Sequence, residues 1–434
     1  MIRWVLVLAL LFTEPAASQD SGGVRADLTL GIGGEISRDP LLNGASSKRA
    51  SGVGILKFNL SSETRTQRIK LGLEGGRFGG ARQQSKVQLD YSRSTKSSSL
   101  RTYISSQRIP EGGVDAHAFS SADLGALDLA SGQSVQRIRS GGVTLKVGLG
   151  QPVGAVLSYG KRVRKVLDVI PARRSAERLN AEVNLRLNAR TEGKISWAET
   201  RLKSNGATTS TNTDKQLRFG VSHHLRRTLE VTLDGGWQDL KATGFVDSGL
   251  MWRSSFTQHL KSGKRFLFLS RNRTVSGPLV RMQAGLSRNH PAYSLELAVG
   301  MARLKDQSAE PTLVVSYDAK FTPGSLNISA SRDFFGSDDS GETRIGTKFD
   351  MEVVRDFDPT RSLGLTVGYL KTNSTSQTPA RSVGHIGATY RHQLQQDFNL
   401  VVGAHRRRRS EAALGKRSSN SVFITFEKRF AGRF

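Results

Sequence analysis

The chain has 434 residues, of which 64 are Lys or Arg and 37 are Asp or Glu, giving a formal net charge of +27. It has no cysteine, which excludes disulfide bonds, cysteine-ligated zinc and thiol chemistry. The excess of positive charge favours nucleic acid as a partner, and the segments below test that interpretation in chain order.

The N-terminus, MIRWVLVLALLFTEPAASQD, has the pattern of a secretory signal peptide. Arg3 supplies a positive start, and Trp4–Phe12 is an apolar run too short to cross a bilayer, which needs about 20 residues. The run does not alternate as a strand would, and small residues precede an expected cleavage site after Ser18. We therefore predict a signal peptide at residues 1–18 and one exported domain at residues 19–434. Export argues against a DNA or RNA partner.

From Leu28 onward, apolar and polar residues alternate in one segment after another, which predicts β-strands with one apolar and one polar face. The pattern occurs at Leu28–Ile32, Leu56–Leu60, Ile69–Leu73, Val87–Tyr91, Val143–Leu149, Val183–Leu187, Leu217–Val221, Leu229–Leu233, Tyr293–Val299, Leu313–Tyr317, Leu326–Ile328, Leu363–Val367 and Val422–Phe426. It is weak at 245–257 and 265–271. No helical period persists, and no later segment has the roughly 18 consecutive apolar residues of a transmembrane helix. The predicted fold class is all-β.

Three features favour a transmembrane barrel over a soluble secreted β protein, which stays as an alternative. Many segments span about 9–12 residues, the length of a tilted strand that crosses a bilayer. Connections alternate between short ones, such as Asn188–Gly193, and long polar ones, such as 107–138, 165–176 and 407–419. The chain ends in SVFITFEKRFAGRF, which resembles the C-terminal insertion signal of outer-membrane barrels. The residues of this expected signal are Phe426, Phe430 and Phe434.

We therefore predict a transmembrane antiparallel up-and-down β-barrel of about 22 strands, with a range of roughly 16–22. A barrel this wide is not filled by its own strand side chains, so its lumen should hold water or an inserted segment. Only a few residues lie between Gln19 and the expected first strand. This spacing leaves no room for an N-terminal plug or passenger domain, and it disfavours siderophore-type transporters, barrel-assembly factors and autotransporters.

Two early hairpins carry a resemblance to a known family. FNLSSETRTQRIKLGLEGG (Phe58–Gly76) and VQLDYSRSTKSSSLRTYISSQR (Val87–Arg108) resemble an outer-membrane β-barrel, porin-like protein family of Gram-negative bacteria that is largely uncharacterised. The resemblance implies a fold and an outer-membrane location. It implies no substrate and no catalytic residues.

The polar faces of the strands supply candidate lumen residues. The candidate pore-lining cations are Lys57, Lys70, Arg101, Lys146, Arg186, Arg218, Arg281 and Lys348. Carboxylates such as Glu74, Asp90 and Glu182 lie on the same strand faces as these cations. Two interpretations stay open: the charges pair across strands and fix the register, or they line a water-filled pore with a weak anion preference.

The longest connection, 109–136, is acidic and contains no Lys or Arg before Arg137. We predict that it folds inward as a constriction loop facing the basic wall, with an external loop over the barrel mouth as the alternative. Its acidic residues are Glu111, Asp115, Asp123 and Asp128. The basic run His405–Arg409 and the cluster Arg162, Lys165, Arg173 and Arg174 are assigned to connections. There they either bind the phosphates of lipopolysaccharide or stay solvated without a fixed partner.

No nucleophile motif, phosphate-binding loop or metal-ligand spacing is present in the sequence, so we expect neither an enzyme nor a cofactor or metal. The sequence predicts a porin-like channel for passive or semi-selective diffusion of small hydrophilic solutes, mildly preferring anions. The alternative is a barrel for envelope polysaccharide export, or a structural barrel, that works with a partner. Expected partners are outer-membrane lipid, lipopolysaccharide, the barrel-assembly machinery and small solutes.

Overall fold

The protein is described by a computed structural model that covers residues 23–38, 48–77, 84–109, 135–167, 172–205, 209–305, 307–336, 343–374, 380–411 and 415–433. The predicted signal peptide lies outside the described residues and stays a prediction. Among the described residues, no helix is long and apolar enough to cross a membrane.

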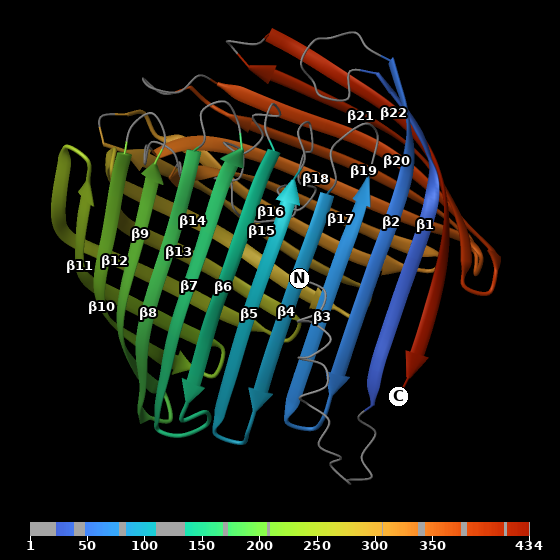
Figure 1. Ribbon diagram of the computed structural model, residues 1–434. Helices are drawn as coiled ribbons and strands as arrows, with labels where there is room; N and C mark the ends of the chain where they lie inside the picture. Colours follow the sequence, from blue (N-terminus) through green and yellow to red (C-terminus); the bar gives the residue numbers. More distant parts are fainter. Residues whose placement is uncertain are drawn as a thin grey trace.

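The described residues form a single sheet of 22 antiparallel strands (Figure 1). The strands are β1 (Val24–Arg38), β2 (Lys48–Glu63), β3 (Gln67–Arg77), β4 (Gln84–Ser94), β5 (Ser98–Ile109), β6 (Val135–Val147), β7 (Val153–Leu167), β8 (Ala172–Asn188), β9 (Thr191–Asn205), β10 (Thr209–Arg226), β11 (Leu229–Ala242), β12 (Phe245–Leu260), β13 (Gly263–Thr274), β14 (Gly277–His290), β15 (Tyr293–Leu304), β16 (Glu310–Phe321), β17 (Gly324–Gly336), β18 (Thr343–Asp358), β19 (Arg361–Thr372), β20 (Arg381–Gln395), β21 (Phe398–Glu411) and β22 (Gly415–Arg433). The prediction of an all-β fold with 22 strands is confirmed.

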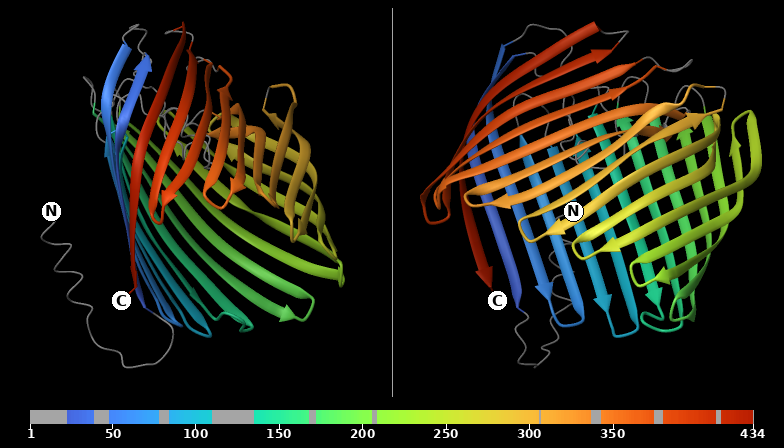
Figure 2. Two further views of the ribbon diagram at one scale, coloured as in Figure 1. Left: turned by 90° about the vertical axis from the view of Figure 1, so that its right-hand side faces the viewer. Right: turned by 180° about the vertical axis from the view of Figure 1, so that it is seen from behind.

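The sheet closes on itself because β1 pairs with β22, from Arg25 opposite Arg433 to Arg38 opposite Asn420. Closure leaves no free sheet edge, which is what a strand structure in lipid requires, since unpaired backbone groups are costly there. Strands β1–β10 form one wall, and strands from β13 to β21 cross behind them at a large angle (Figure 2). This crossing follows from strand tilt in a closed, twisted sheet.

The barrel has two different rims. The start of β1 and the end of β22 lie at one rim, here called the terminal rim (Figure 1). Tight turns join strands there, for example 189–190 between β8 and β9 and 227–228 between β10 and β11. The opposite end is called the loop rim. In outer-membrane barrels the turns are short on the periplasmic side, so the terminal rim corresponds to the periplasm.

The outer face is apolar and exposed. Ile32 is 73% exposed, Leu250 is 67% exposed and Val422 is 57% exposed. Near the terminal rim, outward aromatic rings are accompanied by cations, with the Lys428 Nζ atom 5.2 Å from the centre of the Phe430 ring. An apolar band with aromatic residues at its border matches the lipid–water boundary of an outer-membrane barrel.

Near the loop rim, parts of the wall are two layers thick. Leu279 of β14 and Ala302 and Leu304 of β15 point inward and form a buried cluster with Phe334 of β17 and Ile345 of β18. The ends of β17 and β18 therefore lie over the inner face of β14 and β15. The guanidinium of Arg281 supports this arrangement, because its Nη2 atom donates to Asp333 Oδ1 at 2.7 Å.

A second overlap involves β11, β12 and β13. Gln238, an inward residue of β11, accepts from the backbone N–H of Arg273 at 2.9 Å and donates to its carbonyl at 3.0 Å. Pairing of β12 with β13 begins only at Trp252 opposite Arg271, so the end of β13 leaves β12 and covers the inner face of β11. Met251 and Leu240 are buried beneath it.

Candidate functional site: the inner wall

The cations selected from sequence share the inner face of the sheet. The registers place each of them on the strand face opposite the outward apolar side chains, such as Leu56 beside Lys57 and Ile104 on the strand of Arg101. These residues are Lys57, Lys70, Arg101, Lys146, Arg186, Arg218, Arg281 and Lys348. Their inward placement agrees with the sequence pattern. That they line a conducting pore stays a prediction.

On the wall formed by β2–β5, inward charges of opposite sign face each other. Lys57 lies opposite Glu74, and Glu74 lies opposite Lys86 on the next strand. Lys70 lies opposite Asp90, whose carboxylate is also 3.9 Å from the guanidinium of Arg101. Such pairs fix the register of neighbouring strands. The same inward side chains can therefore both fix the strand register and face the lumen.

The pattern continues on β8–β10. Lys194 Nζ lies 2.6 Å from Glu182, and Arg186 Nε lies 3.9 Å from Glu192. On β10, Arg218 donates to Gln216 Oε1 at 2.5 Å. Donors and acceptors alternate along this wall, so it can bind a polar solute without presenting one strong charge.

A polar hollow of about 350 Å³ lies against β1–β4. Its lining residues are Asp27, Asn59, Leu60, Ser61, Lys70, Leu71, Gly72, Glu74, Lys86, Gln88 and Asp90. Lys70 and Asn59 are exposed to solvent there, and Gln88 Nε2 donates to Asp90 at 2.6 Å. Amines, amides, hydroxyls and carboxylates all meet in this hollow, which suits a small hydroxylated or charged solute.

A second inward group, the loop-rim cations, was not recognised as a group from sequence, although Arg344 was assigned to the inner face. Its members are Arg162 and Arg164 of β7, Arg174 of β8, Arg344 of β18, Arg381 of β20, Arg407 and Arg409 of β21, and Arg417 of β22. Arg344 is 3% exposed and Arg409 is 5% exposed. Glu35 of β1 interacts electrostatically with Arg407. The inner wall is thus more basic near the loop rim than against β1–β4.

The assignment of Arg162, Arg174, Arg407 and Arg409 to connections was wrong. β7 extends to Leu167 and β8 starts at Ala172, while β21 extends to Glu411 and β22 starts at Gly415. Strand geometry therefore distributes the run on β21 between two faces. Arg407 and Arg409 point inward, whereas Arg406 and Arg408 point outward and are exposed.

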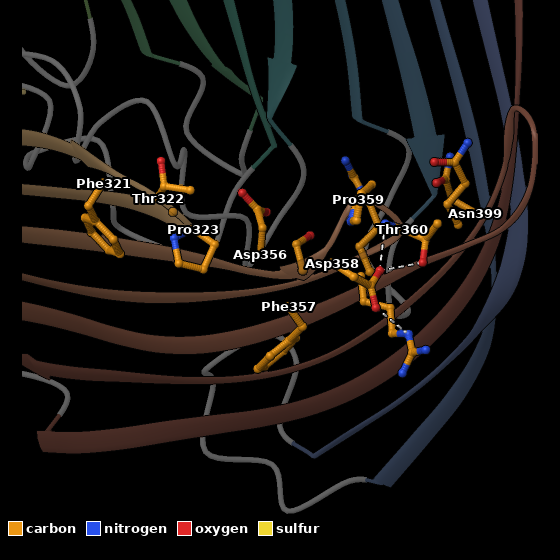
Figure 3. A pocket seen from close by; sticks show the side chains of 14 residues that line it. Phe321, Thr322, Pro323, Asp356, Phe357, Asp358, Pro359, Thr360 and Asn399 are labelled. Atoms are coloured by element: carbon orange, nitrogen blue, oxygen red, sulfur yellow. Dashed lines mark hydrogen bonds and ion pairs between the residues drawn. The ribbon is translucent and has the colours of Figure 1, made fainter.

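A hollow of about 620 Å³ lies at the terminal rim (Figure 3). It is bordered by the turns at Thr322-Pro323 and Pro359-Thr360. The carboxylate of Asp358 accepts hydrogen bonds from the Thr360 N–H at 2.8 Å and hydroxyl at 2.6 Å. This carboxylate, which also lies 3.0 Å from the Arg361 Nε atom, stabilises the turn that borders the hollow.

The remaining predicted features are outward or outside the described residues. Phe426 and Phe430 lie on the outer face of β22, 39% and 46% exposed. Their role as an insertion signal stays a prediction, and Phe434 lies outside the described residues. The predicted constriction-loop residues Glu111, Asp115, Asp123 and Asp128 also lie outside them.

Several solved structures share this fold. The ferric enterobactin receptor PfeA of Pseudomonas aeruginosa is 10% identical, with a TM-score of 0.54 over 95% of this chain and 82% of that chain. The siderophore receptor PirA of Pseudomonas aeruginosa is 9% identical, with a TM-score of 0.55 over 95% and 81%. The FrpB iron transporter of Neisseria meningitidis is 7% identical, with a TM-score of 0.57 over 95% and 82%.

At these identities the likeness shows the fold alone. No family model matches the chain, and no curated protein matches it. The resemblance to a porin-like family therefore has no support beyond the general architecture. The closed sheet, the apolar outer face and the solved barrels agree on that architecture, which is that of an outer-membrane β-barrel.

Proposed function

We propose that the barrel is an outer-membrane channel through which small hydrophilic solutes cross, with a preference for anions. The observation that carries the proposal is the inner wall. It is basic near the loop rim, and against β1–β4 it becomes a solvent-exposed ladder of paired charges around a polar hollow.

The order of these two zones suits uptake from outside. A solute entering at the loop rim meets the loop-rim cations, whose field raises the local concentration of anions. It then reaches the β1–β4 wall, where donors and acceptors are already partly paired. Conduction requires binding strong enough for entry and weak enough for release, and a mixed wall meets the second condition.

The solved barrels are two siderophore receptors and an iron transporter, which supports transport as the broad class of function for this fold. They also suggest a second candidate, a receptor that binds its solute tightly rather than an open channel. The overlap of β17 and β18 on β14 and β15 favours this candidate, because it thickens one wall and narrows the lumen.

Planar-bilayer recording of the purified full-length barrel tests the proposal. We expect a stable open conductance and a reversal potential that indicates anion preference. Replacing the exposed inward residues Lys57, Lys70 and Lys146 with Gln should lower the anion-to-cation permeability ratio by about twofold or more. A matched control replaces the exposed outward residues Lys371, Arg406 and Arg408 with Gln and should leave the ratio unchanged.

Deletion of residues 109–136 tests the constriction loop in the same recordings. We expect a larger conductance and a stronger anion preference, because the deletion removes four carboxylates. Unchanged conductance and selectivity would eliminate the constriction role. A folded barrel without any conductance would overturn the channel proposal. It would favour the receptor, or a polysaccharide-export or structural barrel that works with a partner.

A further inference from the structure

Four cations lie in direct register on four consecutive strands. Arg108 of β5 is opposite Arg137 of β6, Arg137 is opposite Lys165 of β7, and Lys165 is opposite Arg173 of β8. Directly opposite residues have their Cβ atoms about 4.5–5.5 Å apart, and like charges at that distance destabilise a sheet. A bound anion would offset the repulsion between these four cations.

This row lies on the outer face of the barrel. Arg137 shares its parity with the exposed Val143 and Leu145 of β6, and Lys165 shares its parity with the exposed Leu157 of β7. Arg137, Lys165 and Arg173 are themselves exposed. The row sits near the loop rim, because β5 and β7 end there and β6 and β8 begin there.

Neighbouring cations enlarge the row into a patch. Arg139 of β6 lies two residues from Arg137 on the same face, and Lys203 of β9 lies opposite Ser175 of β8. We call this set the outer basic patch: Arg108, Arg137, Arg139, Lys165, Arg173 and Lys203.

The carboxylates nearby are in closer contact with cations outside the patch, and Glu177 also interacts electrostatically with Lys203 of the patch. Glu177 lies 2.5 Å from Lys161, and Glu199 lies 2.6 Å from Arg201. Among the described residues, no member of the outer basic patch has a carboxylate within ion-pair distance. The patch therefore keeps a concentrated positive charge at the border of the lipid band.

We propose that the outer basic patch binds the phosphorylated head group of an outer-leaflet glycolipid, the lipid A part of lipopolysaccharide. The loop rim faces the outside of the cell in a barrel whose ends and short turns are periplasmic. Arginine binds phosphate through two parallel N–H donors, and lysine adds a point charge.

The surface beneath the patch matches the rest of such a molecule. Leu157 is 50% exposed and Tyr159 is 41% exposed on β7, and Leu145 is 39% exposed on β6. These side chains continue the patch toward the middle of the barrel wall and are apolar. An anion with acyl chains therefore fits both the patch and the band, whereas a soluble anion fits the patch alone. The proposal concerns the outer surface and is independent of whether the lumen conducts.

The test compares two triple variants of the full-length barrel, refolded in a zwitterionic detergent. The patch variant is Arg137→Gln with Lys165→Gln and Arg173→Gln. The control is Arg265→Gln with Arg288→Gln and Lys428→Gln, which removes the same charge from exposed outward residues at the terminal rim. Heat-modifiable migration on a gel verifies that each variant is folded.

Native mass spectrometry measures binding of purified bisphosphorylated lipid A, with dephosphorylated lipid A and inorganic phosphate as separate probes. We expect the wild type and the control to bind bisphosphorylated lipid A, and the patch variant to bind about tenfold or more weakly. Dephosphorylated lipid A should bind weakly to all three proteins. Added salt should weaken wild-type binding, because the contact is electrostatic.

Thermal unfolding gives a second, independent readout. Without lipid, the patch variant should be at least as stable as the wild type, since the repulsion between Arg137, Lys165 and Arg173 is removed. Lipid A should raise the unfolding temperature of the wild type and not that of the patch variant. Equal lipid A binding by the patch variant and the wild type would overturn the proposal. So would equal binding of dephosphorylated lipid, or equal stabilisation by inorganic phosphate alone.

Discussion

The inner wall against β1–β4 and the inner wall of β14–β18 near the loop rim are built from the same kind of strand but bury their side chains differently. Against β1–β4, Lys57 and Lys70 are exposed around a polar hollow of about 350 Å³. On β15, Leu304 is 0% exposed and Ala302 is 1% exposed, because the ends of β17 and β18 cover them.

The difference shows that a closed sheet need not have uniform thickness. Where neighbouring strand ends fold inward, the inner face becomes a small apolar core, and its residues follow the rules of a soluble interior. Where no second layer forms among the described strands, the inner face stays polar. Solutes are therefore expected to pass along β1–β4 rather than along the thickened side.

The largest expected loss of stability is that of Leu304→Ala. Truncating a fully buried leucine removes apolar contacts and leaves a cavity, so the free energy of unfolding should fall by about 2–5 kcal/mol. Leu89→Ala on β4 is the control, since that side chain is outward and 39% exposed. It should cost about 1 kcal/mol. Urea unfolding in lipid vesicles measures both values, and equal losses would mean that no second layer protects Leu304.

Substitution of two inward glycines by alanine should give the next largest difference in stability. A Cβ atom at Gly300 of β15 would collide with the carbonyl oxygen of Met282 on the neighbouring strand, whereas a Cβ atom at Gly72 of β3 would have Asn59 Oδ1 at 3.4 Å as its nearest neighbour. Gly300→Ala should therefore lower the free energy of unfolding by about 2 kcal/mol through overpacking. Gly72→Ala should be close to neutral. Unfolding curves for both variants test this, and a neutral Gly300→Ala would show that β14 and β15 adjust freely.

Sequence pattern predicted the strands because a membrane barrel imposes alternation on nearly every segment. The inward parity of Lys57 and Lys70 followed directly from that alternation. The run Arg406–Arg409 did not, because four consecutive charges hide which face each residue occupies, and it was placed in a connection.

The second layer could not be predicted, although it left a signal. Segments 245–257 and 265–271 alternate weakly because both of their faces are apolar in places. Met251 is buried under the end of β13, between the outward Leu250 and Trp252. Interrupted alternation inside a barrel sequence thus indicates an inner face covered by protein. Which strand end covers it depends on tertiary contacts that no local pattern encodes.

The ion pair between Arg281 and Asp333 gives the smallest effect that still separates the two regions. The pair holds the end of β17 against β14, its Nη2–Oδ1 distance is 2.7 Å, and its side chains are only 19% and 25% exposed. Asp333→Asn keeps the shape and removes the charge, leaving Arg281 half-buried without its carboxylate. We expect a loss of about 1–2 kcal/mol, because the remaining charge stays poorly solvated.

The matched variant Asp90→Asn acts on the open side. Arg101 is 71% exposed and 3.9 Å from Asp90, which is 25% exposed, so the two pairs differ in the arginine, and water already solvates the Arg101 guanidinium. Exposed pairs contribute little, and the loss should be below about 0.5 kcal/mol and should shrink further in high salt. Salt-dependent unfolding of both variants separates the two cases. Comparable losses would mean that Arg281 is as well hydrated as Arg101, and that the end of β17 does not shield it.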